Sequence, residues 1–456
     1  MRTRTPTRTW TISQTRIDGS GALATARSAA AEQTIETTVG ALGADGDGVL
    51  HADGRTLFVP YVLPGERVRV HAAGRQAAIL DEVLDASIDR VAPPCGLFGR
   101  CGGCTLQHMQ GRAMESFKRG LVCDALTQAG FTLPDEIGFV GTEPYTRQRM
   151  DLALRRTSSG VLVGLHRRAG PDADGIVDMT ECHVLEPRLF ALVTAMRPML
   201  LRLGCLHGTG SAIVNLLDSG PDLLLATDVS PDTADRARIA DFARENGIPR
   251  IAWRPLKGSS LEPETICTTG PVRHHLSGSS ISPPPGAFLQ ASRDSEAAIV
   301  TAVLAGLPAN MARAARIIEL YAGCGTLSFA LATRGKVLAV EGHKQSAACL
   351  LMAAPGMRIE AQHRDLIRQP LLAKELGKAA VIVLDPPFSG TGPQIREITQ
   401  AAVPRVIMVS CNPRVLRQDA ALLHAAGYRL EQLTVIDQFL WSSGVESVSV
   451  FVKPKR

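Results

Sequence analysis

The sequence predicts an α/β protein with several domains: a doubly wound α/β domain in the C-terminal part, a small β-barrel near the N-terminus, and a strand-rich stretch between them. The 456 residues exceed one ordinary domain, since domains run to roughly 100–200 residues. After residue 286, apolar runs alternate with glycine-rich turns and helical patterns. Residues 36–84 instead contain short alternating runs separated by turns, which is typical of strands.

The composition narrows the class of protein. Hydrophobic residues make up 45% of the chain, enough for packed cores, and the net charge of +5 is compatible with a polyanionic partner without requiring one. No apolar run approaches the ~20 residues of a membrane span, and the N-terminus lacks the apolar segment of a signal peptide. Ten cysteines without a secretion signal indicate a reducing compartment. We therefore expect a cytoplasmic protein that does not bind membranes and is a monomer without an obligate protein partner.

The N-terminal part divides at about residue 36. Residues 1–35 are rich in arginine and threonine and are expected to form a disordered tail, with a transit peptide or an RNA-contacting arm as alternatives. Residues 36–92 are expected to form the barrel, with strands at Thr56–Val59 and Arg67–Val70 and a turn at Leu63–Glu66. Such barrels often bind single-stranded nucleic acid, although a purely structural barrel fits the pattern equally well.

A group of cysteines marks the expected central domain, residues 93–276. Cys95, Cys101, Cys104 and Cys182 provide four soft ligands, which suit zinc or an iron–sulfur cluster. Spacing alone does not separate the two, although three nearby cysteines plus a distant one is common for 4Fe–4S centres. Residues 186–276 carry no recognisable chemical pattern. Residues 277–286 contain three prolines, which exclude helix and predict an extended linker.

A cofactor pattern opens the expected C-terminal domain, residues 277–456. The strand Arg316–Leu320 is followed by Gly323 and Gly325, which allow close approach of the backbone to a ligand before the helical pattern at 327–332. A second strand ends at Glu341, where a carboxylate can accept both hydroxyls of a ribose. A dinucleotide fingerprint would need another glycine near position 328, where this chain has Ser328. A nicotinamide or flavin cofactor is therefore only the alternative. The pattern instead resembles motif I of class I S-adenosylmethionine-dependent methyltransferases, with Asp365 expected to meet the adenine amino group.

Two further strands carry candidate catalytic residues to the same sheet edge. Ala379–Leu384 precedes Asp385, and Arg405–Val409 precedes Cys411. Because ligands of such sheets bind outside the carboxyl ends of the strands, both side chains should border the cofactor site. The last strand pattern, Val445–Val452, contains Glu446.

These residue types suit methylation of carbon-5 of uracil, which is too weak a nucleophile to react unaided. A thiolate adding to carbon-6 makes an enolate whose carbon-5 can attack a sulfonium methyl group. A base must then remove the carbon-5 proton so that the thiol is eliminated. Cys411 fits the nucleophile and Glu446 the base. Taken singly, each has a simpler interpretation, a buried cysteine and a surface carboxylate, but their combination with Asp385-Pro386-Pro387 indicates a site.

Ordered motifs support this interpretation by resemblance. The chain resembles the RNA uracil-5 methyltransferase family, and most closely the branch with an N-terminal TRAM barrel and a 4Fe–4S cluster that methylates 23S rRNA. The resemblance implies a Rossmann-like class I methyltransferase domain, a TRAM/OB-like barrel and a central iron–sulfur domain. It rests on LPGE at 63–66, Cys95, CGGCTLQH at 101–108, IVDMTEC at 176–182, FLQ at 288–290, ELYAGCGT at 319–326, DPPFSG at 385–390, SCNP at 410–413 and GVES at 444–447.

The resemblance also implies residue roles. S-adenosylmethionine would be contacted by Gln290, Tyr321, Glu341 and Asp385, beside the motif residues Gly323, Gly325, Thr326 and Asp365. Cys411 would be the nucleophile and Glu446 the proton acceptor, and the four cysteines would hold the 4Fe–4S cluster. The chain departs from the family pattern at Thr326 and Ser292, where asparagine is usual, and at Gly444, where histidine is common. Residues 440–443, LWSS, also replace the usual Pro-x-Thr-Gly.

Other functions remain open at this point. Asp-Pro-Pro followed by an aromatic residue also serves exocyclic-amine methyltransferases, which need no thiol. RNA cytosine-5 methyltransferases usually place their cysteine directly after Asp-x-Pro, where this chain has Pro387. A catalytically vestigial RNA-binding factor of ribosome assembly would be a different class of protein. Within the uracil enzymes, transfer RNA competes with ribosomal RNA as the substrate, and the barrel and cysteines favour ribosomal RNA.

Overall fold

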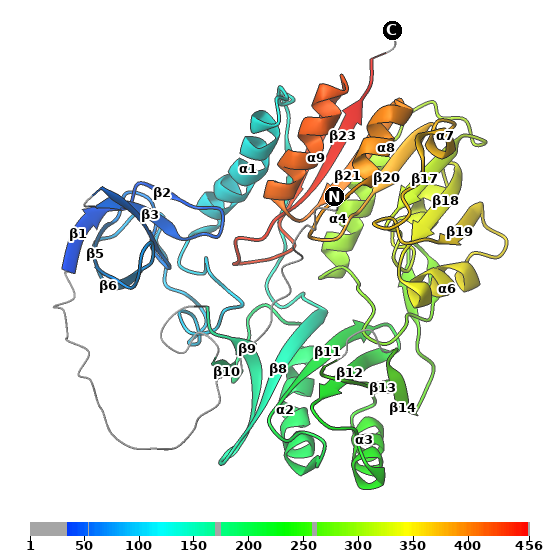
Figure 1. Ribbon diagram of the computed structural model, residues 1–456. Coiled ribbons are helices and arrows are strands. Elements are labelled where there is room, and N and C mark those ends of the chain that lie inside the picture. The colour runs from blue at the N-terminus through cyan, green and yellow to red at the C-terminus, as the bar shows by residue number, and fades with distance from the viewer. Residues whose placement is uncertain (1–33, 53, 169–174, 258–261, 455–456) are drawn as a thin grey trace, which may run out of the picture.

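The computed structural model describes residues 34–52, 54–168, 175–257 and 262–454 (Figure 1). The expected N-terminal tail lies outside these residues, except that the first strand already begins at Thr34. Within the described ranges, no helix is both long enough and apolar enough to cross a membrane. The strands form two small three-stranded sheets, a seven-stranded sheet, an eight-stranded sheet and one isolated hairpin.

The N-terminal strands surround a small core of their own. Two three-stranded antiparallel sheets, ordered β1-β5-β6 and β2-β3-β4, pack around Leu50, Leu57, Val68 and Val70, all of which are buried. The turn at 63–66 reverses the chain where expected, with Gly65 at a φ of 83° that favours glycine. The strands are β1 Thr34–Thr38, β2 Ala41–Leu42, β3 Gly48–Ala52, β4 Arg55–Val59, β5 Arg67–Ala72 and β6 Ala78–Asp85.

The middle of the chain forms the seven-stranded sheet, ordered β10-β9-β8-β11-β12-β13-β14. All neighbours are antiparallel except β12 and β13, which are parallel and joined through helix α3. Helices α2 and α3 contribute to its apolar core. The elements are β8 Arg149–Thr157, β9 Gly160–His166, β10 Ile176–Asp178, α2 Pro187–Arg202, β11 Thr209–Leu217, β12 Gly220–Thr227, α3 Thr233–Glu245, β13 Arg250–Pro255 and β14 Glu264–Thr268.

The C-terminal part forms the eight-stranded sheet, ordered β19-β18-β17-β20-β21-β23-β22-β7. The first five of these strands are mutually parallel, and β23 runs antiparallel to both neighbours. The doubly wound α/β prediction is therefore confirmed. The elements are α4 Arg293–Ala305, β17 Arg316–Leu320, α5 Ser328–Ala332, β18 Lys336–Glu341, α6 Lys344–Ala353, β19 Ile359–His363, α7 Ala373–Leu376, β20 Val381–Leu384, α8 Gln394–Ala401, β21 Arg405–Ser410, α9 Pro413–Ala425, β22 Arg429–Ile436 and β23 Glu446–Val452.

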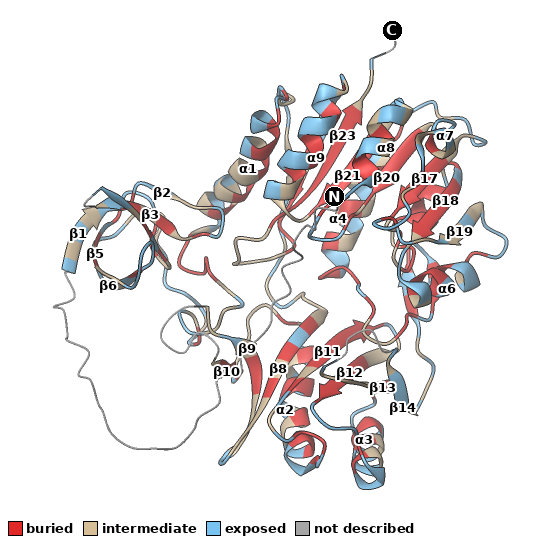
Figure 2. Ribbon diagram, in the orientation of Figure 1, coloured by how far each residue is buried: buried red, intermediate tan, exposed pale blue. Residues whose placement is uncertain are grey.

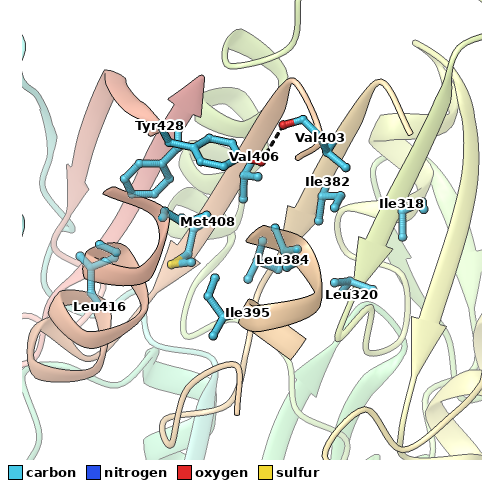
Figure 3. Packing of buried hydrophobic residues seen from close by; sticks show 14 of the residues in the cluster. Ile318, Leu320, Ile382, Leu384, Ile395, Val403, Val406, Met408, Leu416 and Tyr428 are labelled. Carbon is cyan, nitrogen blue, oxygen red and sulfur yellow. Dashed lines mark hydrogen bonds between the residues drawn. The ribbon is translucent and has the colours of Figure 1, made fainter. Parts of the chain in front are cut away.

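Helices cover both faces of this sheet, so that its strands are buried while the outer helix faces are exposed (Figure 2). Alternate residues of each strand point to opposite faces. On β20, Ile382 and Leu384 belong to one core, whereas Val381 and Val383 belong to the other. The first core, with Leu416 of α9 and Ile395 of α8, is drawn in Figure 3. The Tyr428 hydroxyl closes that core by donating to the Val403 carbonyl at 2.7 Å.

Two elements lie far from their sequence neighbours. Helix α1 (Gly111–Gln128) and strand β7 (Gly138–Val140) fall in the expected central range, yet α1 packs against α9 and β7 pairs with β22 at the edge of the eight-stranded sheet. The expected linker also differs in part. Strands β15 (His274–Leu276) and β16 (Ser279–Ile281) form a hairpin there, turning through Ser277 and Gly278 with positive φ, and the prolines follow it.

Candidate active site and cysteine cavity

Four parallel strands end at one edge of the eight-stranded sheet and deliver the candidate residues there. Tyr321 follows β17, Glu341 ends β18, Asp385 follows β20, and Cys411 follows β21. The strands are in register as neighbours, with Leu320 paired to Leu384. This is the edge at which such sheets bind ligands, so the residues share the position that the sequence analysis expected.

The turn after β17 is shaped by two glycines. Gly323 has a φ of 57° and Gly325 a φ of 103°, both in the left-handed region. A Cβ atom at Gly325 would lie 2.6 Å from the Phe329 ring. The Gly323 amide does not point freely outward but donates to Glu341 Oε2 at 2.7 Å, and the His343 amide donates to Glu341 Oε1 at 2.6 Å. Each carboxylate oxygen has a further lone pair, so Glu341 can still accept ribose hydroxyls.

The other expected cofactor residues differ in burial and in their hydrogen-bond partners. Gln290 is buried and donates from Nε2 to Asp385 Oδ2 at 3.4 Å, while its Oε1 atom is buried without a partner. The Tyr321 hydroxyl donates to the Thr391 carbonyl at 2.8 Å. Thr326 lies half-buried just before α5. Asp365 is exposed two residues beyond β19, and its Oδ1 atom accepts from the amides of the turn that follows.

The sheet register brings Cys411 and Glu446 together. Strands β21 and β23 are antiparallel with Ser410 paired to Ser447, so the next residue of each strand along the pair is Cys411 and Glu446. The Ser447 hydroxyl donates to the Ser410 carbonyl at 3.3 Å across this pair. Asn412 then begins α9, because its Oδ1 accepts from the helix amides of residues 414 and 415 while its Nδ2 donates to the Phe388 carbonyl at 3.0 Å.

The electrostatics of this group favour neutral side chains. Burial, together with the charges of Glu446 and Asp385, raises the pKa of the Cys411 thiol to about 12. Burial likewise raises the Asp385 pKa to about 7, which a hydrogen bond from Gln290 opposes. Burial and the Asp385 charge hold the Glu446 pKa well above its usual value. A cation placed among these three groups would be strongly favoured, and the sulfonium of S-adenosylmethionine is such a cation.

Two buried polar residues of this site were not singled out from the sequence. Gln438 donates to Glu446 Oε2 at 2.5 Å and accepts from the Ala291 amide at 3.4 Å, whereas Glu446 Oε1 is buried without a partner. Glu319 lies fully buried behind the glycine turn, and burial raises its pKa to about 8. The position of Gln438 could have been found, because it follows a strand, β22, that runs parallel to β21 and ends at the same edge.

Two exposed aromatic side chains flank the same segments. Phe288, two residues before Gln290, is 66% exposed, and Phe388, three residues after Asp385, is 70% exposed. The guanidinium of Arg149 lies 5.1 Å from the centre of the Phe288 ring. Flat exposed rings beside a positive charge are suited to stacking of nucleic-acid bases.

The four predicted cysteine ligands line one cavity of about 220 Å³. Cys95, Cys101, Cys104 and Cys182 face it together with the apolar side chains of Met150, Leu165, Met179 and Leu185. The thiols are close enough to act on one another, since burial and the charges of the other three cysteines raise the Cys104 pKa to about 12. Charged and polar side chains, among them Arg147 and Glu181, line the cavity as well, and four sulfur ligands fit an iron–sulfur cluster or zinc by their chemistry.

A second donor set overlaps the cavity wall. Three side chains, those of Cys95, Glu181 and His183, each offer one ligand atom, and these three atoms lie within 4.8 Å of one another. Hydrogen bonds already engage this set, since Glu181 accepts from the Gly96 amide at 2.7 Å and pairs with His183 at 3.1 Å. The His183 ring also contacts the Tyr145 hydroxyl at 2.5 Å. Glu181 and His183 are therefore better described as residues that support the cysteine ligands than as part of a separate metal site.

Comparison with known proteins agrees with this geometry. A family model described as tRNA (uracil-5-)-methyltransferase matches residues 362–454. A curated RNA methyltransferase of Mesorhizobium japonicum, itself uncharacterized, is 35% identical over 423 residues, covering 92% of this chain and 98% of the relative. The 23S rRNA (uracil(1939)-C(5))-methyltransferase RlmD of Halomonas elongata is 32% identical over 449 residues, covering 94% and 91%. The crystal structure of Pyrococcus abyssi tRNA (uracil-54, C5)-methyltransferase in complex with S-adenosyl-L-homocysteine has the same fold, with a TM-score of 0.67 at 19% identity over 92% of this chain and all of that one.

The fold is that of a methyltransferase, and the family model and the relatives show that the chain is a methyltransferase that uses S-adenosylmethionine. Within that class, the chain belongs to the RNA uracil-5 methyltransferase family. It is an enzyme, and the reaction of its family is transfer of a methyl group to carbon-5 of uridine in RNA.

Proposed function

We propose that this enzyme methylates carbon-5 of a uridine in 23S rRNA through a covalent adduct between Cys411 and the uracil ring. The observation that carries this proposal is the register of β21 and β23, which sets Cys411 opposite the buried carboxyl of Glu446 with Asp385 beside them. An exocyclic-amine methyltransferase would need the Asp385 segment alone, and neither a thiol nor a second carboxylate would have a task there.

Cys411 and Glu446 each have one task in this reaction. The Cys411 thiolate adds to carbon-6, and the ring electrons move toward carbon-4, so that carbon-5 becomes the nucleophile. Bound S-adenosylmethionine supplies the electrophilic methyl group. Glu446 then accepts the proton of carbon-5, the electrons of that C–H bond form the carbon-5–carbon-6 double bond, and the carbon–sulfur bond breaks with its electron pair returning to Cys411. The enzyme is thereby restored apart from one proton on Glu446, which solvent removes.

The residues at the sheet edge fit S-adenosylmethionine. Glu341 has lone pairs left for the ribose, while Asp385 and Gln290 supply a carboxylate and an unpartnered amide oxygen next to Cys411. Binding of the sulfonium lowers the pKa of all three acidic groups, because an opposite charge stabilises their ionised forms. We propose further contacts from Tyr321, Gly323, Gly325, Thr326 and Asp365, which lie at the same edge.

For the cysteine cavity we propose a 4Fe–4S cluster held by Cys95, Cys101, Cys104 and Cys182. Its support is the donor set, four thiols around one cavity, which suits soft metal centres. Such a centre would fix the 95–104 segment against the residues after β10 and thereby order the part of the chain that adjoins the catalytic sheet.

Ribosomal RNA is the favoured substrate class for two reasons. The RlmD relatives, which are 23S rRNA methyltransferases, cover 94% and 90% of this chain. We propose that the small strand unit of residues 36–92 contributes to RNA binding, and Phe288 and Phe388 offer exposed rings for stacking. Transfer RNA is the alternative that the experiment must distinguish.

The test is to incubate the purified enzyme with labelled S-adenosylmethionine and with rRNA and tRNA from a strain that lacks it, and to map the labelled nucleotide. We expect 5-methyluridine in 23S rRNA. A transcript carrying 5-fluorouridine at the mapped position should trap a covalent complex, because fluorine cannot leave as a proton does. Cys411→Ala should abolish both results, and methylation that survives this change would refute the mechanism.

A further inference from the structure

The loop of residues 437–445, here called the base loop, connects β22 to β23 and leads directly into Glu446. It also carries Gln438, which hydrogen-bonds the Glu446 carboxyl. The distance between that carboxyl and a substrate therefore depends on what holds the base loop. Segments from two distant parts of the chain do so.

Helix α1 holds the beginning of the base loop. Lys118 is fully buried, forms an ion pair with Asp437, and donates to the Phe439 carbonyl at 3.0 Å. These contacts bracket Gln438 on both sides. The Asp437 amide is held as well, since it donates to the Val140 carbonyl at the end of β7 at 2.8 Å.

The cysteine segment holds the middle of the base loop. The amides of Thr105 and Leu106, which follow Cys104, both donate to the Trp441 carbonyl, at 2.7 and 2.8 Å. Trp441 has a φ of 58°, a conformation that costs free energy unless its surroundings fix it. Phe439, Leu440 and Ser442 also line the cysteine cavity.

We propose that Lys118 is a positioning residue for the proton-abstraction half of the reaction, acting through the base loop on Gln438 and Glu446. This inference rests on the proposed function. A buried ion pair contributes little net stability, because loss of hydration offsets its attraction, whereas it does fix geometry. Cys411 follows β21, whereas the contacts of Lys118 are with Asp437 and Phe439 of the base loop. Adduct formation and methyl transfer should therefore tolerate loss of Lys118, and removal of the carbon-5 proton should not.

The experiment compares the two halves of the reaction in the full-length enzyme. In Lys118→Met/Asp437→Asn, which leaves no unpaired buried charge, we expect trapping by 5-fluorouridine RNA within about threefold of wild type. Turnover on ordinary RNA should fall on the order of 10²-fold, the typical effect of a displacement near 1 Å. The isotope effect of 5-deuterated uridine on turnover should rise, and the covalent complex with ordinary RNA should accumulate.

Matched variants separate positioning from loss of stability. Arg250→Met/Asp222→Asn removes another buried ion pair, which lies in the seven-stranded sheet and has N–O distances of 2.7 and 2.9 Å. This variant should reduce trapping by 5-fluorouridine RNA and turnover on ordinary RNA by the same factor. Lys118→Arg, which keeps the charge, should show the same split to a smaller degree. Equal losses in trapping and turnover, with an unchanged isotope effect, would overturn the proposal. Failure of the proposed function would overturn it too but looks different, because the wild-type enzyme itself would then trap nothing.

Discussion

The cysteine cavity and the Cys411 site both bury thiols, but they surround them with different neighbours. Burial is the main reason that the pKa of Cys104 and that of Cys411 both reach about 12. The acidic groups whose charges raise the Cys104 pKa are thiols, whereas those that raise the Cys411 pKa are the carboxyls of Glu446 and Asp385. Thiols grouped with thiols can share a metal cation, while a thiol grouped with carboxyls has a proton acceptor at hand. In the proposed function, the same amino acid therefore serves ligation in one place and catalysis in the other.

The largest change in turnover that bears on this comparison is expected for Glu446→Gln. Without the proton acceptor, turnover should fall by roughly 10²- to 10⁴-fold, the usual contribution of a general base. Adduct formation should continue, so ordinary uridine RNA should become trapped on Cys411, which denaturing gels would show. Glu431→Gln, a change at a half-exposed carboxylate on β22, is the matched control. Loss of the adduct together with turnover would mean that Glu446 acts earlier in the reaction.

The same variant tests the electrostatic half of the comparison. The Glu446 charge raises the Cys411 pKa, so removing it should lower that pKa and increase the thiolate fraction below the pKa. In the absence of cofactor, at a pH above the raised pKa of Glu446 and below about 12, Glu446→Gln should therefore be alkylated at Cys411 faster than wild type. Peptide mass spectrometry measures the rate. A slower or unchanged rate would contradict the assigned neighbours.

The cysteine cavity should respond to loss of a ligand in another way. Cys104→Ser is expected to lose bound metal, measured by absorbance and metal analysis, and to unfold at least about 5 °C lower, since 1 kcal/mol shifts Tm by roughly 2–4 °C in domains of 150–250 residues. Cys123→Ser, at a half-buried thiol that packs on the catalytic sheet, should keep the metal. Full metal content in Cys104→Ser would exclude this cysteine as a ligand and favour the set of Cys95, Glu181 and His183.

The smallest effect is expected at the cofactor turn. Glu341→Gln replaces one acceptor oxygen by an amide that faces a backbone N–H, and it removes a charged acceptor for the ribose. We expect affinity for S-adenosylmethionine to fall roughly 10- to 100-fold, since hydrogen bonds to charged groups contribute about 1.5–3 kcal/mol. Calorimetry measures it, with Glu360→Gln, an exposed carboxylate on the neighbouring strand β19, as the control. Equal affinity in both variants would remove Glu341 from the cofactor site.

Much of the catalytic sheet could be predicted from the sequence. The run Arg316–Leu320 forms β17 with the expected bounds, and the run expected at 379–384 forms β20 two residues shorter. Buried parallel strands are nearly all apolar, and the chain marks their ends with glycine, proline or polar residues, so both signals are local. The grouping of Asp385 and Cys411 at one edge followed from the direction of parallel strands alone.

Contacts between distant segments could not be predicted in this way. Lys118 and Asp437 are separated by 319 residues, and a lysine on a helix is ordinarily a solvated residue. Nothing near α1 or β7 in the sequence indicates that both join the eight-stranded sheet. The hairpin at the expected linker is not evident from the sequence, because Ser277 and Gly278, which form its turn, are followed closely by three prolines.

The sequence by itself determined which residues are candidates for the chemistry, because residue type and spacing along the chain mark the proposed nucleophile, acids and sulfur ligands. Only the tertiary structure decided how these residues are held: the opposition of Cys411 and Glu446, the support of Glu446 by Gln438, and the anchoring of the base loop by α1 and the cysteine segment. The physical reason is that strand composition is local, whereas strand pairing and burial of a charge depend on segments that meet only when the chain is folded.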